Sequence, residues 1–124
     1  MYFVARAQAI AHAYGRDVVG WEEIWDNFGT KLDPSTIIQL WIPGSTIGPA
    51  VVEAGYRLIW SQDGTWYLDG LDTTWQTMYI QDPCVGIESQ YDSLVLGGEG
   101  CMWGETVDTS DIQVRLHDDN QMDD

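Results

Sequence analysis

Four short apolar runs limit most strongly how this chain can fold. Within each run, apolar residues follow one another instead of alternating with polar ones, which is typical of strands that are buried on both faces. Segments with helical spacing or turn residues separate the runs, as in a parallel sheet whose strands are joined by helices. We therefore expect an α/β fold with parallel strands. The runs cover residues 18–21, 37–41, 56–61 and 94–97.

The chain opens with a segment whose apolar residues recur at alternating spacings of four and three. This spacing places them on one face of a helix, and Gly15 follows as a typical helix end. We therefore predict that the chain begins with an amphipathic helix. The residues of the apolar face are Phe3, Ala7, Ile10 and Tyr14.

Turn residues and helix signals lie between the apolar runs. The Asp-Pro-Ser sequence at 33–35 is typical of a turn. A short helix is predicted over 47–54. Asp72 is the predicted N-cap of a further helix that runs through Trp75 and Tyr79.

The length of 124 residues fits one domain at most. We expect this domain to span residues 1–116, because the composition changes after them. The end of the chain contains four aspartates and scarcely an apolar residue, so it cannot pack on a sheet. Residues 117–124 are therefore predicted to form an acidic, disordered tail.

The charge of the chain is one-sided, with five Lys and Arg against twenty Asp and Glu and a formal net charge of −15 at pH 7. Such a chain repels phosphate backbones and anionic lipids, which argues against nucleic-acid and membrane partners. No apolar run approaches the roughly 18 residues that a membrane helix needs. The acidity leaves open a neutral or cationic substrate, an acidic or saline medium, or solubility alone.

Neither a cofactor nor a metal site is predicted from the sequence. His12, in the first helix, and His117, in the tail, lack the spacing of metal ligands. Cys84 and Cys101 could form one disulfide bond or remain thiols, and their spacing does not decide between the two. No histidine is placed to activate Cys101 as a nucleophile.

Aromatic and acidic residues follow the carboxyl ends of the predicted strands. In parallel α/β folds this edge of the sheet carries the functional site. Each tryptophan alone could simply fill a core, but core filling gives tryptophan no reason to prefer one end of every strand. The set therefore predicts an aromatic box for a sugar ring, with carboxylates that bind its hydroxyls. The residues are Trp21, Trp41, the 66–69 cluster, and Trp103 with Glu105.

Four motifs in this order and spacing resemble the β-N-acetylhexosaminidases of glycoside hydrolase family 20. They are Val-Val-Gly-Trp-Glu-Glu at 18–23, Ile-Ile-Gln-Leu-Trp at 37–41, Trp-Tyr-Leu-Asp at 66–69 and Gly-Gly-Glu-Gly-Cys-Met-Trp-Gly-Glu at 97–105. The resemblance implies a (β/α)8 TIM barrel that removes terminal N-acetylglucosamine or N-acetylgalactosamine from glycans. This chain would supply the C-terminal half, strands five to eight with their helices.

The resemblance also implies a role for each motif residue. In this family the sugar's own acetamido oxygen attacks the anomeric carbon. Tyr67 would hold that oxygen and stabilise the charge that develops on it. The other positions would bind the substrate: Trp21, Trp41 and Trp103 around the ring and the acetamido methyl, and Asp69 and Glu105 at the outer hydroxyls.

One departure limits what this chain is expected to do. The family's catalytic Asp-Glu pair is absent, because the chain contains no Asp-Glu dipeptide, and Glu22-Glu23 and Glu99 are not its equivalents. We therefore expect a partial sequence that is inactive alone. A non-catalytic N-acetylhexosamine-binding half-pocket and a non-functional truncated product remain the alternatives. The resemblance further implies a lysosomal or secreted enzyme, with a possible homodimer in the full-length parent.

Overall fold

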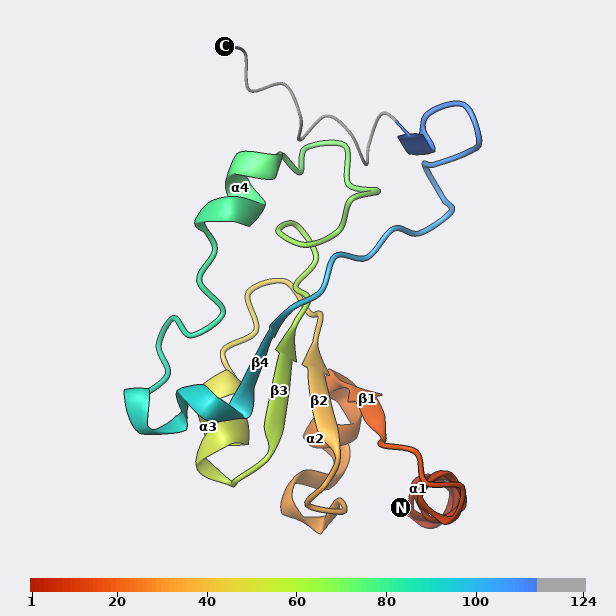
Figure 1. Ribbon diagram of the computed structural model, residues 1–124, viewed down its shortest axis with the longest axis vertical. Coiled ribbons are helices and arrows are strands. Elements are labelled where there is room, and N and C mark those ends of the chain that lie inside the picture. The colour runs from red at the N-terminus through yellow and green to blue at the C-terminus, as the bar shows by residue number, and fades with distance from the viewer. Residues whose placement is uncertain (114–124) are drawn as a thin grey trace.

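The computed structural model describes residues 1–113, and its centre is a sheet of four parallel strands (Figure 1). The strands lie side by side in chain order, β1-β2-β3-β4. This order has no point at which the chain reverses direction across the sheet, unlike doubly wound folds. The carboxyl ends of the strands therefore meet at one edge. Their bounds are β1 Val19–Trp21, β2 Ile37–Leu40, β3 Arg57–Trp60 and β4 Val95–Gly98.

All four apolar runs form strands, as predicted, but the expectation that every strand is buried on both faces was wrong. Only β2 is buried at all four positions. The outer strands β1 and β4 each have one neighbouring strand, and Val19 and Leu96 keep 49% and 50% of their surface exposed. An apolar run thus predicted the strand correctly and its burial only at the centre of the sheet.

Helices α2, Glu22–Phe28, and α3, Gly48–Glu53, pack with one face of the sheet. Fully buried side chains of β2 and β3 meet valines from α3 in this layer. Burying an aliphatic side chain stabilises the fold by roughly 1.5–3 kcal/mol, so this layer holds the strands in register. The fully buried aliphatic side chains are Ile38, Leu40, Val51, Val52 and Leu58.

The first helix, α1 at Tyr2–Ala13, forms as predicted, but its predicted apolar face does not pack. Phe3 and Tyr14 are mostly exposed, and Gln8 is the buried residue of the helix. Figure 1 shows α1 beyond β1 at the side of the sheet. The Gln8 amide donates a hydrogen bond to the Thr36 hydroxyl at 3.1 Å. Val4 packs against the core, and this polar contact joins α1 to the residue before β2. The spacing of apolar residues could not indicate the polar contact.

The remaining elements connect the strands. The predicted helix over 47–54 is confirmed as α3, and the Asp33 carbonyl accepts from Thr36 N in the predicted turn. The N-cap of α4 is Thr74 and not Asp72, because the Thr74 hydroxyl accepts from Thr77 N. The other bounds are α4 Trp75–Ile80 and two 3-10 helices, η1 Gly29–Lys31 and η2 Ser89–Leu94.

The predicted tail at 117–124 lies outside the described residues, as does the end of the predicted domain. In the part of the chain that is described, no helix is both long and apolar enough to cross a membrane.

Candidate active site

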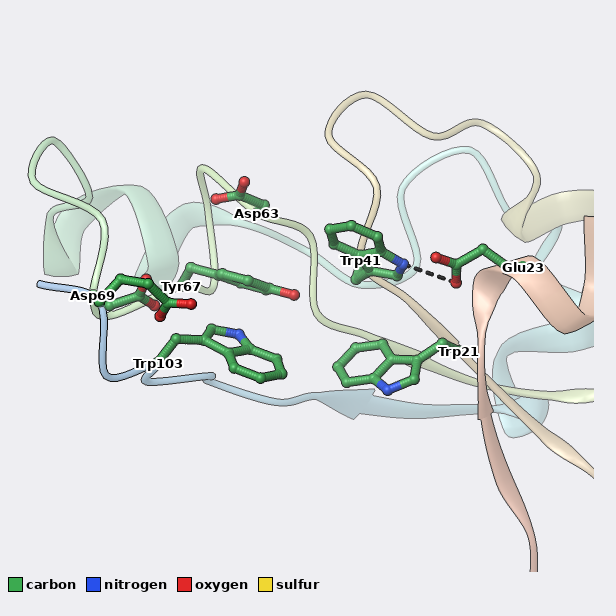
Figure 2. Close-up of a pocket in the computed structure, with 8 residues that line it drawn as sticks. Trp21, Glu23, Trp41, Asp63, Tyr67, Asp69 and Trp103 are labelled. Atoms are coloured by element: carbon green, nitrogen blue, oxygen red, sulfur yellow. Dashed lines mark hydrogen bonds between the residues drawn. The ribbon is translucent and has the colours of Figure 1, made fainter.

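An open pocket of about 500 Å³ lies beyond the carboxyl ends of the strands (Figure 2). It brings together all six residues that the sequence predicted for the site. Two further acidic residues line it, Glu23 and Asp63, which sequence reasoning did not place there. The lining residues are Trp21, Glu23, Trp41, Asp63, Tyr67, Asp69, Trp103 and Glu105.

The aromatic rings form a continuous wall. The ring centroids of Trp21 and Trp41 are 6.3 Å apart at an interplanar angle of 77°. Trp103 links this pair to Tyr67, with centroid distances of 6.4 Å to Trp21 and 6.5 Å to Tyr67. These separations are typical of interacting aromatic pairs. Trp21 and Trp103 remain exposed, so their faces can accept a ligand.

Trp21 and Trp41 are held where neighbouring strands end. Trp21 is the last residue of β1, and Trp41 directly follows β2. The Glu22 carboxylate accepts hydrogen bonds from the backbone nitrogens of Trp41 and Ile42, at 3.2 and 3.1 Å. The Glu23 carboxylate accepts from Trp41 Nε1 at 3.0 Å, as Figure 2 shows. The two glutamates after β1 thus bind the tryptophan that follows β2.

Tyr67 lies on the loop after β3, and this loop pairs with the segment after β4. Leu68 N donates to the Cys101 carbonyl at 2.7 Å, and Cys101 N donates to the Trp66 carbonyl at 2.9 Å. These bonds extend the sheet beyond the ends of its regular strands. Figure 2 shows the Tyr67 hydroxyl directed into the space between Trp103 and the two other indoles.

The environment of Tyr67 keeps its hydroxyl protonated. Burial raises the pKa of the Tyr67 phenol above its ordinary value of 10.0, a shift that the Trp103 indole partly offsets. Burial disfavours the charged phenolate, which is the physical cause of the increase. At neutral pH, Tyr67 is therefore a hydrogen-bond donor aimed into the pocket.

The glycines of the last motif allow close approach. An added Cβ on Gly98 would lie 2.5 Å from the Trp66 ring, and Gly97 has a φ of +125°. Beside them, the Ser61 hydroxyl donates to the Glu99 carbonyl at 2.9 Å. Only glycine at position 98 lets the indole of Trp66 lie against the backbone of β4.

Cys84 and Cys101 are both free thiols. The sequence had left open a disulfide bond between them as the other state. Burial raises the pKa of the Cys101 thiol, and the hydrogen bond to Ser61 opposes this increase. The thiol therefore stays protonated under neutral conditions and contacts Ser61 Oγ at 3.1 Å.

Carboxylates surround the aromatic wall and can accept hydrogen bonds from hydroxyl groups. The Asp69 carbonyl accepts from the Thr106 hydroxyl at 2.5 Å, which ties the two acidic segments of the pocket together. Asp63 is fixed through its backbone nitrogen, which donates to the Trp41 carbonyl. Among residues 1–113, no group of three or more His, Cys, Asp or Glu side chains could hold a metal ion.

Three acidic residues at the site escaped sequence prediction for identifiable reasons: Asp63 and Glu23 in the pocket lining, and Glu22 behind it. Asp63 belongs to an Asp-Gly sequence, which predicts a turn and hides any role of the side chain. As two adjacent acids, Glu22 and Glu23 invite comparison with a catalytic pair and show nothing of their bonds to Trp41. Their position directly after a strand-end tryptophan was the one available signal.

The parallel sheet defines a protein of the α/β class, and its strand ends carry indoles, a phenol and carboxylates around an open pocket. The comparisons with known proteins name the family. Residues 1–118 match the family described as glycosyl hydrolase family 20, catalytic domain, and the chain belongs to this family.

Individual relatives agree with the family. β-Hexosaminidase 1 of Arabidopsis thaliana is 49% identical over 110 residues, which are 88% of this chain and 20% of that protein. This chain thus spans about a fifth of the relative's length. A mutant Streptomyces plicatus β-hexosaminidase in complex with its product GlcNAc is 27% identical, with a TM-score of 0.69 over 89% of this chain and 25% of that one.

A more distant structure shares the fold. An inactive mutant of a family 20 exo-β-N-acetylglucosaminidase from Vibrio harveyi has a TM-score of 0.73 at 19% identity. It covers 93% of this chain and 21% of that chain. The arrangement of the four strands is therefore kept at low sequence identity.

Proposed function

We propose that this chain supplies the sugar-binding half of an exo-β-N-acetylhexosaminidase, strands five to eight of a (β/α)8 barrel. The enzyme would remove terminal N-acetylglucosamine or N-acetylgalactosamine from glycans. The observation that carries this proposal is the pocket in which the Tyr67 hydroxyl faces the indoles of Trp21, Trp41 and Trp103. Membership of family 20 supports it.

The pocket suits a sugar with apolar faces and polar edges. Indole faces take the apolar faces of a pyranose ring and the acetamido methyl, because both are apolar and flat enough for close contact. Asp69 and Glu105 accept hydrogen bonds from the outer hydroxyls, where gluco and galacto epimers differ. Figure 2 shows Asp69 at the end of the pocket formed by Tyr67 and Trp103.

Tyr67 is the chain's own contribution to the chemistry. Its hydroxyl donates a hydrogen bond to the acetamido oxygen and orients that oxygen toward the anomeric carbon. As the oxygen attacks, positive charge develops on the acetamido group and the hydroxyl stabilises the ring that closes. The acid that protonates the leaving oxygen, and the aspartate that orients the acetamido nitrogen, would come from an Asp-Glu pair that these 124 residues lack.

A titration with N-acetylglucosamine, followed by tryptophan fluorescence, tests the binding part of the proposal. We expect a saturable change in the chain itself and about tenfold weaker binding in Tyr67→Phe, since the variant lacks one hydrogen bond. Trp75→Phe is the matched control, because Trp75 lies outside the pocket. A wild-type chain without a saturable response would contradict sugar binding.

Hydrolysis is tested on the longest protein that contains this chain. We expect it to cleave an aryl N-acetyl-β-glucosaminide and to lose this activity in Tyr67→Phe. An in-frame upstream segment that ends a strand in Gly-Gly-Asp-Glu would supply the missing pair. An inert protein that nonetheless contains this pair would overturn the proposal.

A non-catalytic N-acetylhexosamine-binding protein is the second candidate. It is favoured by one observation: three indoles and the Tyr67 phenol gather in the pocket of a chain that has no Asp-Glu pair. Saturable sugar binding in a protein without turnover would identify this function, whereas a non-functional product would show neither binding nor a cooperative fold. The remaining proposals follow the family: a glycan partner, a homodimer of the longer protein, and a lysosomal or secreted location.

A further inference from the structure

The structure assigns Glu22 and Glu23 a common role: they are positioning residues that fix Trp41 in the pocket. Glu22 holds the backbone of Trp41, and Glu23 holds its ring. The inference rests on the proposed function, because it concerns the indole that would contact the sugar. It extends that function to residues that are not themselves expected to bind or cleave the substrate.

Glu22 is a buried carboxylate surrounded by donors. Its side chain is only 2% exposed, and it accepts from Trp41 N, Ile42 N and the Ser45 hydroxyl. In the described part of the chain no Lys or Arg forms an ion pair with it. Both of its carboxyl oxygens thus accept hydrogen bonds from this one segment. These bonds fix the turn where the chain leaves β2.

The three donors bonded to Glu22 belong to one short turn, residues 41–45. Gln62 reinforces the same segment, because its amide donates to the carbonyls of Ile42 and Ser45 at 3.1 and 3.0 Å. Side chains thus bind both donors and acceptors of this turn. Glu22 holds the amide of Trp41, while the segment after β3 holds its carbonyl, which accepts from Asp63 N at 2.9 Å.

Glu23 binds the side chain of Trp41, whereas Glu22 binds its backbone. The Nε1–H group is the only donor of an indole ring, and in Trp41 it is directed to the Glu23 carboxylate. Rotation of the ring would break this charge-assisted bond, which is stronger than a neutral one. The bond therefore selects the ring orientation that sets the 77° angle to Trp21.

The three consecutive residues 21–23 thus determine two walls of the pocket. Trp21 provides one indole, and the two glutamates place the second indole relative to the first. Because the three residues are adjacent, any shift of the β1–α2 junction moves both walls together. Glu23 also has its carboxylate bound to Trp41, which explains its presence in the pocket without a catalytic role.

Indole N–H signals in proton–nitrogen NMR spectra of the 124-residue chain test the role of Glu23. Trp41→Phe identifies the Trp41 signal by its loss. We expect Glu23→Ala, which removes the acceptor, to shift this signal and to speed exchange of its hydrogen several-fold. The signals of Trp60 and Trp66, whose ring nitrogens are buried elsewhere, should stay in place. Asp26→Ala is the matched control, because it removes one carboxylate from the exposed face of the same helix. An unchanged Trp41 signal in Glu23→Ala would overturn the inference.

Backbone amide exchange in the wild-type chain tests the role of Glu22 without a variant that can fail to fold. Trp41 N and Ile42 N are bound by this side chain, so their hydrogens should exchange at least tenfold more slowly than in an unstructured peptide. Exchange of these two hydrogens at the rate of an unstructured peptide would contradict the positioning role of Glu22. Ser45→Ala should keep the protection of both amides, because it removes the partner of the other carboxylate oxygen.

Sugar binding separates this inference from the proposed function. If the wild-type chain binds N-acetylglucosamine, Glu23→Ala should weaken binding about three- to tenfold, the loss typical of one hydrogen bond. In a Trp41→Phe background the same substitution should change binding less than twofold, because the ring N–H is gone. Equal losses in both backgrounds would overturn the inference. If the wild-type chain binds no sugar, the proposed function fails and the two NMR measurements still decide the positioning role.

Discussion

The indole of Trp66 lies against the backbone of Gly98, so closely that a Cβ on Gly98 would come within 2.5 Å of the ring. Trp66 precedes Tyr67 on the loop after β3, and Gly98 ends β4. The contact therefore fixes the loop that carries the pocket phenol against β4, one of the two outer strands. Pairing between the Trp66 carbonyl and Cys101 N supports the same arrangement.

Gly98→Ala is expected to destabilise the chain by about 1–3 kcal/mol, the typical cost of forcing extra atoms into a packed contact. The substitution should also weaken sugar binding, because it displaces the loop that carries Tyr67. Chemical denaturation measures the first effect and fluorescence titration the second. Gly104→Ala is the control, since a Cβ there meets nothing within 4 Å. Equal stability of the two variants would contradict this prediction.

Trp103→Ala is expected to weaken N-acetylglucosamine binding by about 1–2 kcal/mol, or roughly five- to thirtyfold, because the sugar loses one indole face. Trp103 is 46% exposed and links the Tyr67 ring to Trp21. Its removal should therefore affect binding more than stability. Trp75→Ala, which removes an indole outside the pocket, is expected to leave the affinity unchanged in the same titration.

The sequence predicted the parts of the molecule that depend on local pattern. The strand at Ile37–Leu40 follows from a mostly apolar run, and the gathering of Trp21, Trp41 and Tyr67 follows from the geometry of parallel strands. Where parallel strands end at a common edge, the residues that follow them meet without further information. The roles of these residues in binding sugar stay predictions.

The sequence could not predict contacts that depend on how separate segments meet. Spacing places Phe3 and Tyr14 on one helical face, but the buried residue of α1 is Gln8, which bonds to Thr36 just before β2. The bonds from Glu22 cross 19 and 20 residues, and nothing in the Glu-Glu dipeptide shows which donors will surround it. Such pairings are decided by tertiary packing.

Alkaline pH should destabilise the chain through Tyr67. Burial raises the pKa of its phenol above 10.0 in the folded state, so the unfolded chain loses this proton first as pH rises. The stability contributed by the protonated phenol is complete below pH 10 and is lost as pH rises through the higher folded pKa. Tyr56 adds to the same loss, since burial also raises its pKa.

Denaturation curves between pH 8 and 12 measure this loss, a range of about two units around the ordinary tyrosine pKa. Tyr67→Phe is expected to flatten the pH dependence in part, with the contribution of Tyr56 remaining. Tyr14→Phe is the control, because the Tyr14 side chain is exposed on α1. An identical pH profile for wild type and Tyr67→Phe would show that the phenol does not contribute.

The outer strands are expected to make the isolated chain self-associate. Val19 on β1 and Leu96 on β4 leave about half of their surface exposed, on strands whose outer backbone groups have no neighbouring strand among the described residues. Exposed strand edges with apolar side chains are templates for pairing between chains. Sedimentation velocity at increasing concentration should therefore detect oligomers.

The double variant Val19→Lys with Leu96→Lys should shift the distribution toward monomer, because charges on an edge strand oppose pairing. Leu71→Lys, which places the same charge on an exposed loop away from the strands, should not. A wild-type chain that stays monomeric and unfolds in one sharp transition would refute the expectation.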